Sequence, residues 1–391
     1  MDSSHIERVG GGASLRRHAC CRLHGAKKDS QGGWIMKALR FHAARDLRLE
    51  DIDPPAAPEP NEVIVAVSHC GICGTDIHEY LDGPIFVSTR PHPLTGATAP
   101  LVLGHEFSGR IAAVGRGVSR FSDGDRVAIL PHLNKPGDYF VRRGIGHISD
   151  TTALVGLSSA YGGMGEYAVL PQDNIVKLPD SVSDEQGALF EPMAVAINAI
   201  DRGGVDAGST VLVTGAGPIG VLVAMAAKAA GASRVVVSEA NPARRRRLES
   251  LQLGYEIVDP TSANFGDAVM GPTEEGLGVD VAVECAGNER ALADCIRLVR
   301  RGGTVVQVGI FVDPPRVDMR LLVSKAVTLT TSWGFPITIG PRVVQMIAVR
   351  QVQPEKIITG RVTMADAIVR GFDTLAQPDQ DHLKILIAVG A

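Results

Sequence analysis

The hydrophobic and polar positions divide the chain into two stretches of different texture. From residue 36 to about residue 183, short apolar runs are separated by turns rich in Gly and Pro, as in NEVIVAV at 61–67 and SGRIAAVG at 108–115. Runs of this length between turn residues are typical of strands. The pattern therefore predicts a mostly β domain, whose first strand is the segment MKALRF that begins at Met36.

From Asp184 the apolar runs become continuous and alternate with helical segments. The runs VLVTGAG, VVVSEA, YEIVDP, VDVAVECAG, GTVVQVGI and VTLTT follow one another between residues 211 and 331. Continuous β-branched runs separated by helices are typical of a parallel sheet that helices cover on both faces. We therefore predict an α/β domain with a doubly wound, six-stranded parallel sheet.

The tail of the chain contains strand-like KIITGRVT, a short helical segment from Met364, and LKILIAVG. Because six strands already complete the parallel sheet, we expect the tail to return to the first domain. The predicted organisation is a β-rich domain at 36–183 plus 349–391, a doubly wound domain at 184–348, and a disordered extension at 1–35.

Composition narrows the classes of function. The chain has 391 residues, and 39 Lys and Arg against 43 Asp and Glu give a formal net charge of −4. This balance gives no general attraction for nucleic acid or anionic lipid, and no run approaches the roughly 20 apolar residues of a membrane span. The six cysteines are scattered and do not form a disulfide framework, so we expect a cytoplasmic protein with a small-molecule partner.

The segment VLVTGAGPIG at 211–220 has G-x-G-x-x-G spacing between a strand and a helix. Such glycines serve a tight turn, close approach of a pyrophosphate to the backbone, and packing of helix on strand, with the phosphates at the helix N-terminus. The next strand ends in an acid placed to bind the adenosine ribose, an agreement that an ordinary Gly-rich turn does not explain. The predicted dinucleotide site contains Gly215, Gly217, Pro218, Ile219, Gly220 and Glu239.

Glu239 favours NAD over NADP, because a carboxylate repels the extra 2′-phosphate. Four consecutive arginines at 244–247 keep NADP open as an alternative, and we include Arg244 among the expected cofactor-binding residues. Consecutive helical positions fan around the axis, however, so most of this run is expected to form a solvated helix face.

Two short segments carry metal-binding residue types: CGICGTDIH at 70–78 and GHE at 104–106. Cys70 and Cys73 form a CxxC, but no second CxxC completes a four-sulfur zinc site, which leaves a redox pair or half of a zinc ribbon as weaker hypotheses. A catalytic zinc needs about three protein ligands and one open position. Cys73, His105 and Glu191 have the required types, although a lone His or Glu is more often structural.

In this order and spacing, GICGTDIHEY, LVLGHEFSG, DGDRVAI, GGMGEYAVLP, ALFEPMAVAINAI and VLVTGAGPIG resemble the zinc-containing medium-chain dehydrogenase/reductase family. The resemblance extends from residue 36 to the C-terminus. It implies a GroES-like catalytic domain, a Rossmann domain, and an active site in the cleft between them. The catalytic zinc ligands that it implies are Cys73, His105, Glu191 and, as an exchangeable ligand, Glu106.

Many members of this family bind a second, structural zinc through four closely spaced cysteines, which would fall between about residues 130 and 163. No cysteine occurs between Cys73 and Cys285. The segment instead offers potential ligands without compact spacing, namely His132, Asp138, His147 and Asp150. We therefore predict one zinc per chain and a core position for Cys70.

The resemblance also implies how the chain handles the substrate. Thr75 matches the family hydroxyl that accepts the substrate proton, and His78 matches a later relay member toward solvent; the alternatives are a turn-stabilising hydroxyl and a surface imidazole. Val308, Gly309 and Ile310 fall where relatives wrap the nicotinamide. We expect hydride transfer from an alcohol carbon to NAD, with zinc as Lewis acid.

The stretch HEYLDGPIF and the long insertion after it are similar to the branch of the family that acts on 2,3-butanediol and acetoin. Sorbitol-type polyol dehydrogenases and L-threonine dehydrogenases share the glutamate-liganded pattern and are the alternatives. A non-catalytic binding protein of the same fold is the alternative from another class. We also expect a homodimer or homotetramer.

Overall fold

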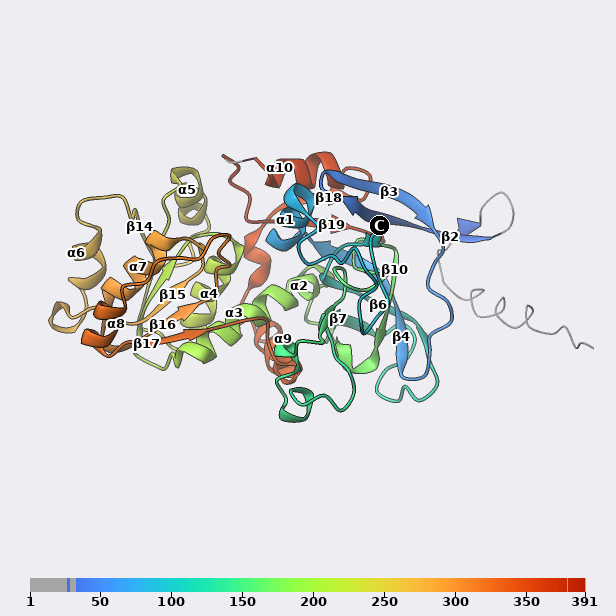
Figure 1. Ribbon diagram of the computed structural model, residues 1–391, viewed down its shortest axis with the longest axis horizontal. Coiled ribbons are helices and arrows are strands. Elements are labelled where there is room, and N and C mark those ends of the chain that lie inside the picture. The colour runs from blue at the N-terminus through green and yellow to red at the C-terminus, as the bar shows by residue number, and fades with distance from the viewer. Residues whose placement is uncertain (1–26, 29–32, 378, 391) are drawn as a thin grey trace, which may run out of the picture.

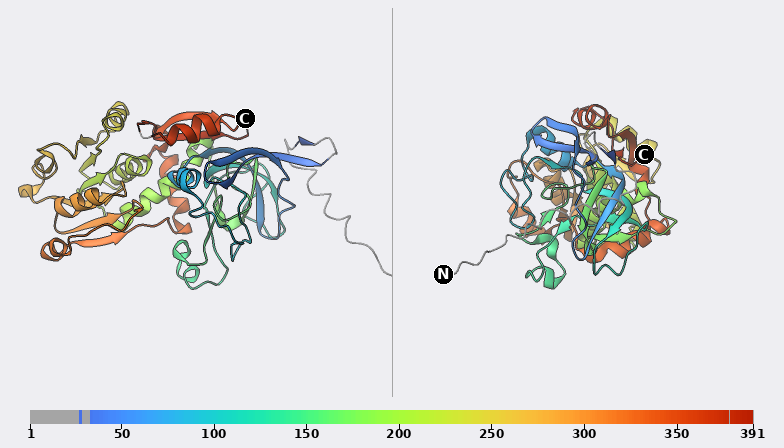
Figure 2. Two further views of the ribbon diagram at one scale, coloured as in Figure 1. Left: turned by 45° about the horizontal axis from the view of Figure 1, so that its top comes forward. Right: turned by 90° about the vertical axis from the view of Figure 1, so that its right-hand side faces the viewer.

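The computed structural model describes residues 27–28, 33–377 and 379–390 and is elongated, with a β-rich region at one end and a helix-covered parallel sheet at the other (Figures 1 and 2). Of the expected extension at 1–35, residues 1–26 and 29–32 lie outside the described residues. Within it, β1 (Lys27–Lys28) pairs antiparallel with the start of β2 (Trp34–Ala43), so the first long strand begins two residues before Met36.

The β-rich region is built on a seven-stranded sheet of order β11-β7-β6-β4-β19-β18, with β10 also paired to β4. The last strand of the chain, β19, thus lies between a strand from the first part of the chain and β18. The members of this sheet are β4 (Glu62–Gly71), β6 (Glu106–Val114), β7 (Arg126–Ile129), β10 (Tyr167–Pro171), β11 (Ile175–Lys177), β18 (Ile358–Thr363) and β19 (Lys384–Ala388).

Smaller elements complete this region. β2 pairs with β3 (Asp46–Ile52) and β5 (Leu101–Val102), and β8 (His132–Leu133) pairs with β9 (Ala153–Leu154). Its short helical elements include α1 (Gly74–Asp82), the 3-10 turn η4 (Gly146–Ile148), α2 (Asp184–Ala188), the π-helical turn η9 (Ala367–Phe372) and α10 (Asp373–Leu375).

The second sheet has six strands, all parallel, in the order β14-β13-β12-β15-β16-β17. Numbered along the chain this order is 3-2-1-4-5-6, the doubly wound arrangement of dinucleotide-binding domains. The predicted fold class and its six strands are confirmed. The strands are β12 (Thr210–Thr214), β13 (Arg234–Ser238), β14 (Glu256–Val258), β15 (Val279–Glu284), β16 (Val299–Gln307) and β17 (Thr328–Thr331).

Helices cover both faces of this sheet because successive strand residues point to opposite sides. In β12, Val211 and Val213 join one core, whereas Leu212 joins the other. The first core is closed by α3 (Phe190–Gly203), α4 (Pro218–Ala229) and α9 (Gly340–Ala348), and the second by α6 (Phe265–Met270), α7 (Glu289–Leu298) and α8 (Met319–Lys325); α5 (Pro242–Ser250) packs beside β14. None of the helices in the described ranges has the length and apolarity that a membrane crossing requires.

Candidate active site

Three side chains with metal-binding atoms form one compact group where β4 ends and β6 begins in the seven-stranded sheet. The ligand atoms of Cys73, His105 and Glu106 all lie within 4.8 Å of one another. Strand pairing creates this group, because β4 and β6 are antiparallel with Gly71 opposite Glu106. A Cβ on Gly71 would lie 2.2 Å from Glu106 Oε2, so the glycine leaves the room that this carboxylate occupies.

Asp76, a fully buried acid, contacts two members of this group. Asp76 Oδ2 accepts the backbone N–H of Cys73 at 2.9 Å and so fixes the first turn of α1. Its other oxygen lies 3.6 Å from His105 Nδ1, and neither atom has a hydrogen-bond partner. A carboxylate beside one ring nitrogen is the usual companion of a histidine that binds a metal through the other.

Two charged residues complete the surroundings of the group. Glu191, in the first turn of α3, lines the same cavity but lies outside the compact group; burial raises its pKa to about 7, and His105 opposes the shift. Lys384 of β19 is 2 % exposed, and its Nζ donates to Glu106 Oε1 and Oε2 at 2.8 and 2.7 Å and to the carbonyl of Ile72. Lys384 was not among the predicted residues.

The donor set fits a zinc ion. It combines a thiol sulfur, an imidazole nitrogen and carboxylate oxygens, which are the ligand types that zinc binds. Burial raises the pKa of the Cys73 thiol, and a metal reverses that effect because it binds the deprotonated thiolate. Cys73, Glu106 and Glu191 also bring three acidic groups together beside Lys384, so a divalent cation would balance the negative charge that they carry when deprotonated.

A cavity of about 380 Å³ opens from this group toward the parallel sheet. Thr75 and His78 line it from α1; Thr75 Oγ1 lies 3.7 Å from Cys73 Sγ, and His78 is exposed. The opposite wall belongs to the second region. This wall includes six of the residues that were predicted to bind the cofactor, namely Gly217, Pro218, Ile219, Val308, Gly309 and Ile310.

A second cavity of about 280 Å³ continues along the edge of the parallel sheet, sharing Gly217, Cys285 and Ala286 with the first. The fingerprint glycines differ in what surrounds them. Gly215 has φ +92°, and a Cβ on Gly220 would lie 1.9 Å from the Gly215 carbonyl oxygen, whereas a Cβ on Gly217 would meet nothing within 4 Å. The open space at Gly217, at the N-terminus of α4, is a cradle that fits a pyrophosphate.

Glu239 and Arg244 line this second cavity. Glu239 is 8 % exposed, and its carboxylate accepts the backbone N–H groups of Ala216 and Asn241 at 2.9 and 2.7 Å. Arg245 and Arg247 point elsewhere, to Asp259 and Asp381 respectively. The arginine run therefore fans around the helix, and Arg244 is its member at the cavity.

In the segment between about residues 130 and 163, where no cysteine occurs, two potential ligands lie closer together than their spacing in the sequence indicates. The imidazole rings of His132 and His147 have centroids 6.1 Å apart in an edge-to-face arrangement. Cys70, by contrast, lies where it was expected, fully buried in the core of the β-rich region. The cysteines of the described residues, Cys70, Cys73, Cys285 and Cys295, are all free.

Comparison with known proteins finds two family models, an alcohol dehydrogenase GroES-like domain at residues 59–180 and a zinc-binding dehydrogenase domain at 218–348. The (R,R)-butanediol dehydrogenase of Bacillus subtilis is 38 % identical over 354 residues, which are 90 % of this chain and 99 % of the relative. Human sorbitol dehydrogenase is 33 % identical, covering 86 % and 92 % of the two chains. The crystal structure of 2R,3R-butanediol dehydrogenase from Bacillus subtilis superimposes with a TM-score of 0.84 at 37 % identity, covering 90 % and 99 %.

Proposed function

Because this chain belongs to the zinc-binding medium-chain dehydrogenase/reductase family, near the butanediol dehydrogenases, we propose that it transfers a hydride between NAD and a secondary alcohol, with 2,3-butanediol and acetoin as the substrate pair. One observation carries this proposal. The Cys73, His105 and Glu106 group opens into the same cavity as the first turn of α4 and the residues after β16.

In this proposal Cys73, His105 and Glu191 would hold the zinc, and Glu106, whose carboxylate accepts from Lys384, would be an exchangeable ligand. When bound, zinc supplies a Lewis acid that makes the alcohol proton more acidic, and NAD supplies the hydride acceptor. The chain supplies the positions of the reactants, because Val308, Gly309 and Ile310 line the cavity wall that would support the nicotinamide ring.

Thr75 and His78 give the alcohol proton a route out. Thr75 Oγ1 lies 3.7 Å from Cys73 Sγ and therefore next to the candidate zinc ligands. His78 follows one turn later on α1 and is exposed, so its imidazole can pass the proton to solvent.

Glu239 supports NAD as the cofactor. Its carboxylate lies at the end of β13, in the cavity that continues from the fingerprint, where a 2′-phosphate would meet a buried negative charge. Arg244 lines the same cavity and is the residue through which NADP would bind if the preference were reversed.

A turnover assay that follows the absorbance of the reduced nicotinamide tests the proposal. We expect NAD and the stereoisomers of 2,3-butanediol to give the highest kcat/KM, with sorbitol and L-threonine as the competing substrates. Metal analysis of the same preparation should give one zinc per chain. Turnover of a polyol without turnover of butanediol or acetoin would refute the substrate while keeping the class, and a zinc-free, inactive protein would indicate a binding protein.

We also propose a cytoplasmic homo-oligomer. The free cysteines of the described residues suit a reducing compartment. Strand β17 is an edge of the parallel sheet, and large apolar side chains are exposed in the adjoining segment, with Val312 89 %, Val323 75 % and Met319 61 % exposed. An unpaired edge beside exposed apolar residues favours association with a second copy. Light scattering should give at least twice the chain mass, and Val323→Glu should reduce it.

A further inference from the structure

A second chamber adjoins the catalytic cavity on the side of the β-rich region. It has a volume of about 440 Å³ and shares five lining residues with the catalytic cavity, which form the boundary between the two: Phe86, His132, Leu154, Leu157 and Trp333. We call the catalytic cavity the inner chamber and the adjoining one the outer chamber. Beyond the boundary the outer chamber is lined by polar side chains that include His92, His147, Thr152 and Ser158.

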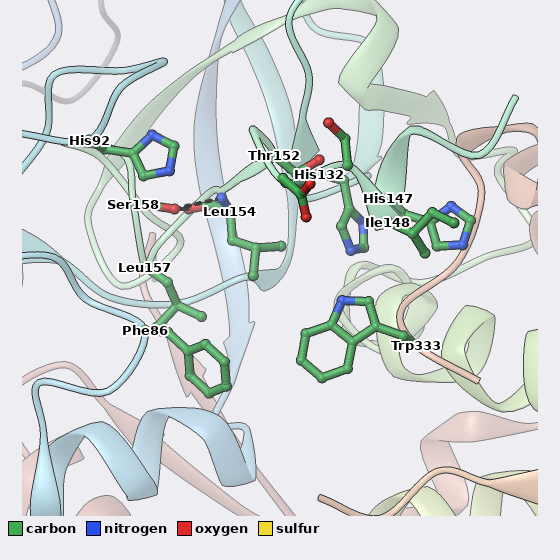
Figure 3. Close-up of a pocket in the computed structure, with 12 residues that line it drawn as sticks. Phe86, His92, His132, His147, Ile148, Thr152, Leu154, Leu157, Ser158 and Trp333 are labelled. Carbon is green, nitrogen blue, oxygen red and sulfur yellow. Dashed lines mark hydrogen bonds between the residues drawn. The ribbon is translucent and has the colours of Figure 1, made fainter. Parts of the chain in front are cut away.

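The aromatic part of the boundary is held in place by a buried acid. Phe86 and Trp333 have ring centroids 6.4 Å apart, and both lie at the same end of the chamber in Figure 3. Glu79, which is fully buried, accepts the backbone N–H groups of Ile85 at 2.9 Å, of Val87 at 3.1 Å, and of Phe86 itself. Glu79 is therefore a positioning residue for the Phe86 side of the passage.

Two histidines on one wall of the outer chamber are buried, and one ring nitrogen of each has no hydrogen-bond partner. His132 is 5 % and His147 is 9 % exposed, and the Nδ1 atom of each is buried without a hydrogen-bond partner. His132 packs edge-to-face on Phe335 at 5.4 Å, and a Cβ on Gly334 would lie 2.6 Å from its Nε2, so its ring is closely confined. Figure 3 shows both rings on the side of the chamber opposite His92.

A buried polar atom without a partner costs about 1–3 kcal/mol. Native structures satisfy most buried polar atoms with protein, water or a ligand, so an unpartnered nitrogen on each of two neighbouring rings calls for an explanation. Because both residues line the cavity, their imidazoles are the polar groups that a ligand would meet on this wall.

The protonation state of these rings selects the chemistry of that group. Burial lowers the pKa of His132 to about 3, and it also lowers the pKa of His147. Both imidazoles are therefore neutral at neutral pH, when each offers one donor and one acceptor. A hydroxyl group matches that combination, whereas an anion would require a proton that burial disfavours.

We propose that the outer chamber binds the hydroxylated tail of a vicinal diol longer than butanediol, with His132 and His147 as specificity-determining residues. The proposal rests on the function proposed above and extends it. Butanediol would occupy only the inner chamber, whereas a longer substrate would cross the boundary beside Phe86 and Trp333 and place a distal hydroxyl against the two imidazoles.

A matched pair of substrates tests the proposal, with 2,3-butanediol as the reference that reports the inner chamber. Hexane-1,2-diol and hexane-1,2,6-triol differ by one distal hydroxyl. We expect kcat/KM of the holoenzyme to be about fivefold higher for the triol, the effect of one neutral hydrogen bond. His147→Phe keeps an aromatic ring and removes both nitrogens, so the triol preference should disappear, whereas His147→Gln should restore part of it.

A second variant gives the control. His42→Phe removes an imidazole that bonds Glu50 and lines neither chamber, and it should keep the wild-type ratio between triol and diol. Thermal unfolding checks that each variant is folded.

The outcomes separate the two proposals. Failure of the wild-type protein to oxidise 2,3-butanediol refutes the proposed function. Turnover of 2,3-butanediol with equal kcat/KM for triol and diol, or a triol preference that survives in His147→Phe, overturns the outer chamber alone. A second zinc equivalent that wild type retains and His147→Phe loses would also overturn it, because the imidazoles would then bind metal.

Discussion

The nucleotide cavity and the catalytic group are assembled from the chain in opposite ways. Gly215, Gly217 and Glu239 belong to one strand–helix–strand segment, and their places follow from local backbone geometry. The catalytic cavity gathers Cys73, His105 and Lys384 from distant points of the chain because β4 pairs with both β6 and β19, and α3 adds Glu191 to the same cavity. Local geometry fixes the first site, and long-range pairing with a balance of buried charge fixes the second. Changes in one should therefore leave the other intact.

The largest expected effect is the loss of the metal. Cys73→Ser should release zinc and lower kcat/KM for 2,3-butanediol by more than about 10³-fold. The affinity for NAD, measured by fluorescence titration, should stay within about twofold because the nucleotide cavity lies in the other region. Cys70→Ala is the control, since Cys70 is a core residue three positions away and its variant should keep its zinc. Equal zinc loss in both variants would contradict the assignment of Cys73.

The next effect concerns the buried charge. Lys384→Met leaves Glu106 without its partner and should lower the free energy of unfolding by about 3–5 kcal/mol in urea denaturation. The exposed pair Lys37–Asp51 is the matched comparison, and Lys37→Met should cost less than about 1 kcal/mol. Adding Glu106→Gln to Lys384→Met should restore part of the loss. If Lys384→Met and Lys37→Met lost similar amounts of unfolding free energy, the buried charge pair would not be what stabilises the catalytic group.

The same contrast decides what the sequence can predict. The six parallel strands and the glycine fingerprint were predictable because each depends on neighbours in the sequence. Lys384 was missed, although one signal was available: a single lysine in the apolar strand LKILIAVG, since lysine is seldom fully buried without a partner. The proximity of His132 and His147 depends on how β8 and η4 fold back on each other, which their spacing does not encode. The domain bounds and the roles of the site residues stay predictions.

We expect acid to lower the free energy of unfolding through His132, which lies in the β-rich region. The pKa of His132 is about 3 in the fold against an ordinary value of 6.5, so below pH 6.5 the unfolded chain takes up a proton that the folded chain does not. The stability from the neutral ring is complete above pH 6.5 and is lost as the pH falls toward 3. Between pH 7 and 5, His132→Phe should lose about 2 kcal/mol less than wild type in urea denaturation. If wild type and His132→Phe lost the same unfolding free energy between pH 7 and 5, the His132 ring would not determine the response to acid.

The smallest expected effects are those of substituting two glycines of the fingerprint: Gly217 should affect NAD binding, and Gly220 should affect stability. Gly217→Ala fills open space, so the unfolding temperature should hold while the affinity for NAD falls about tenfold. Gly220→Ala places a methyl group against the Gly215 carbonyl and should lower the free energy of unfolding by about 1–3 kcal/mol. Calorimetry with and without NAD measures both. A stable Gly220→Ala variant with normal NAD binding would show that helix and strand can separate at little cost.

The position of β19 also bears on the order in which the enzyme matures on the ribosome. The strands of the parallel sheet, β12 to β17, are complete at Thr331, whereas the His69–Gly71 end of β4, which adjoins the catalytic group, lacks its neighbour on one side until residues 384–388 are synthesised. The base that faces Glu106 arrives with the same five residues. A nascent chain can thus acquire its nucleotide-binding half while its catalytic half still waits for its final strand, so a message truncated near its 3′ end yields a protein without a completed metal pocket.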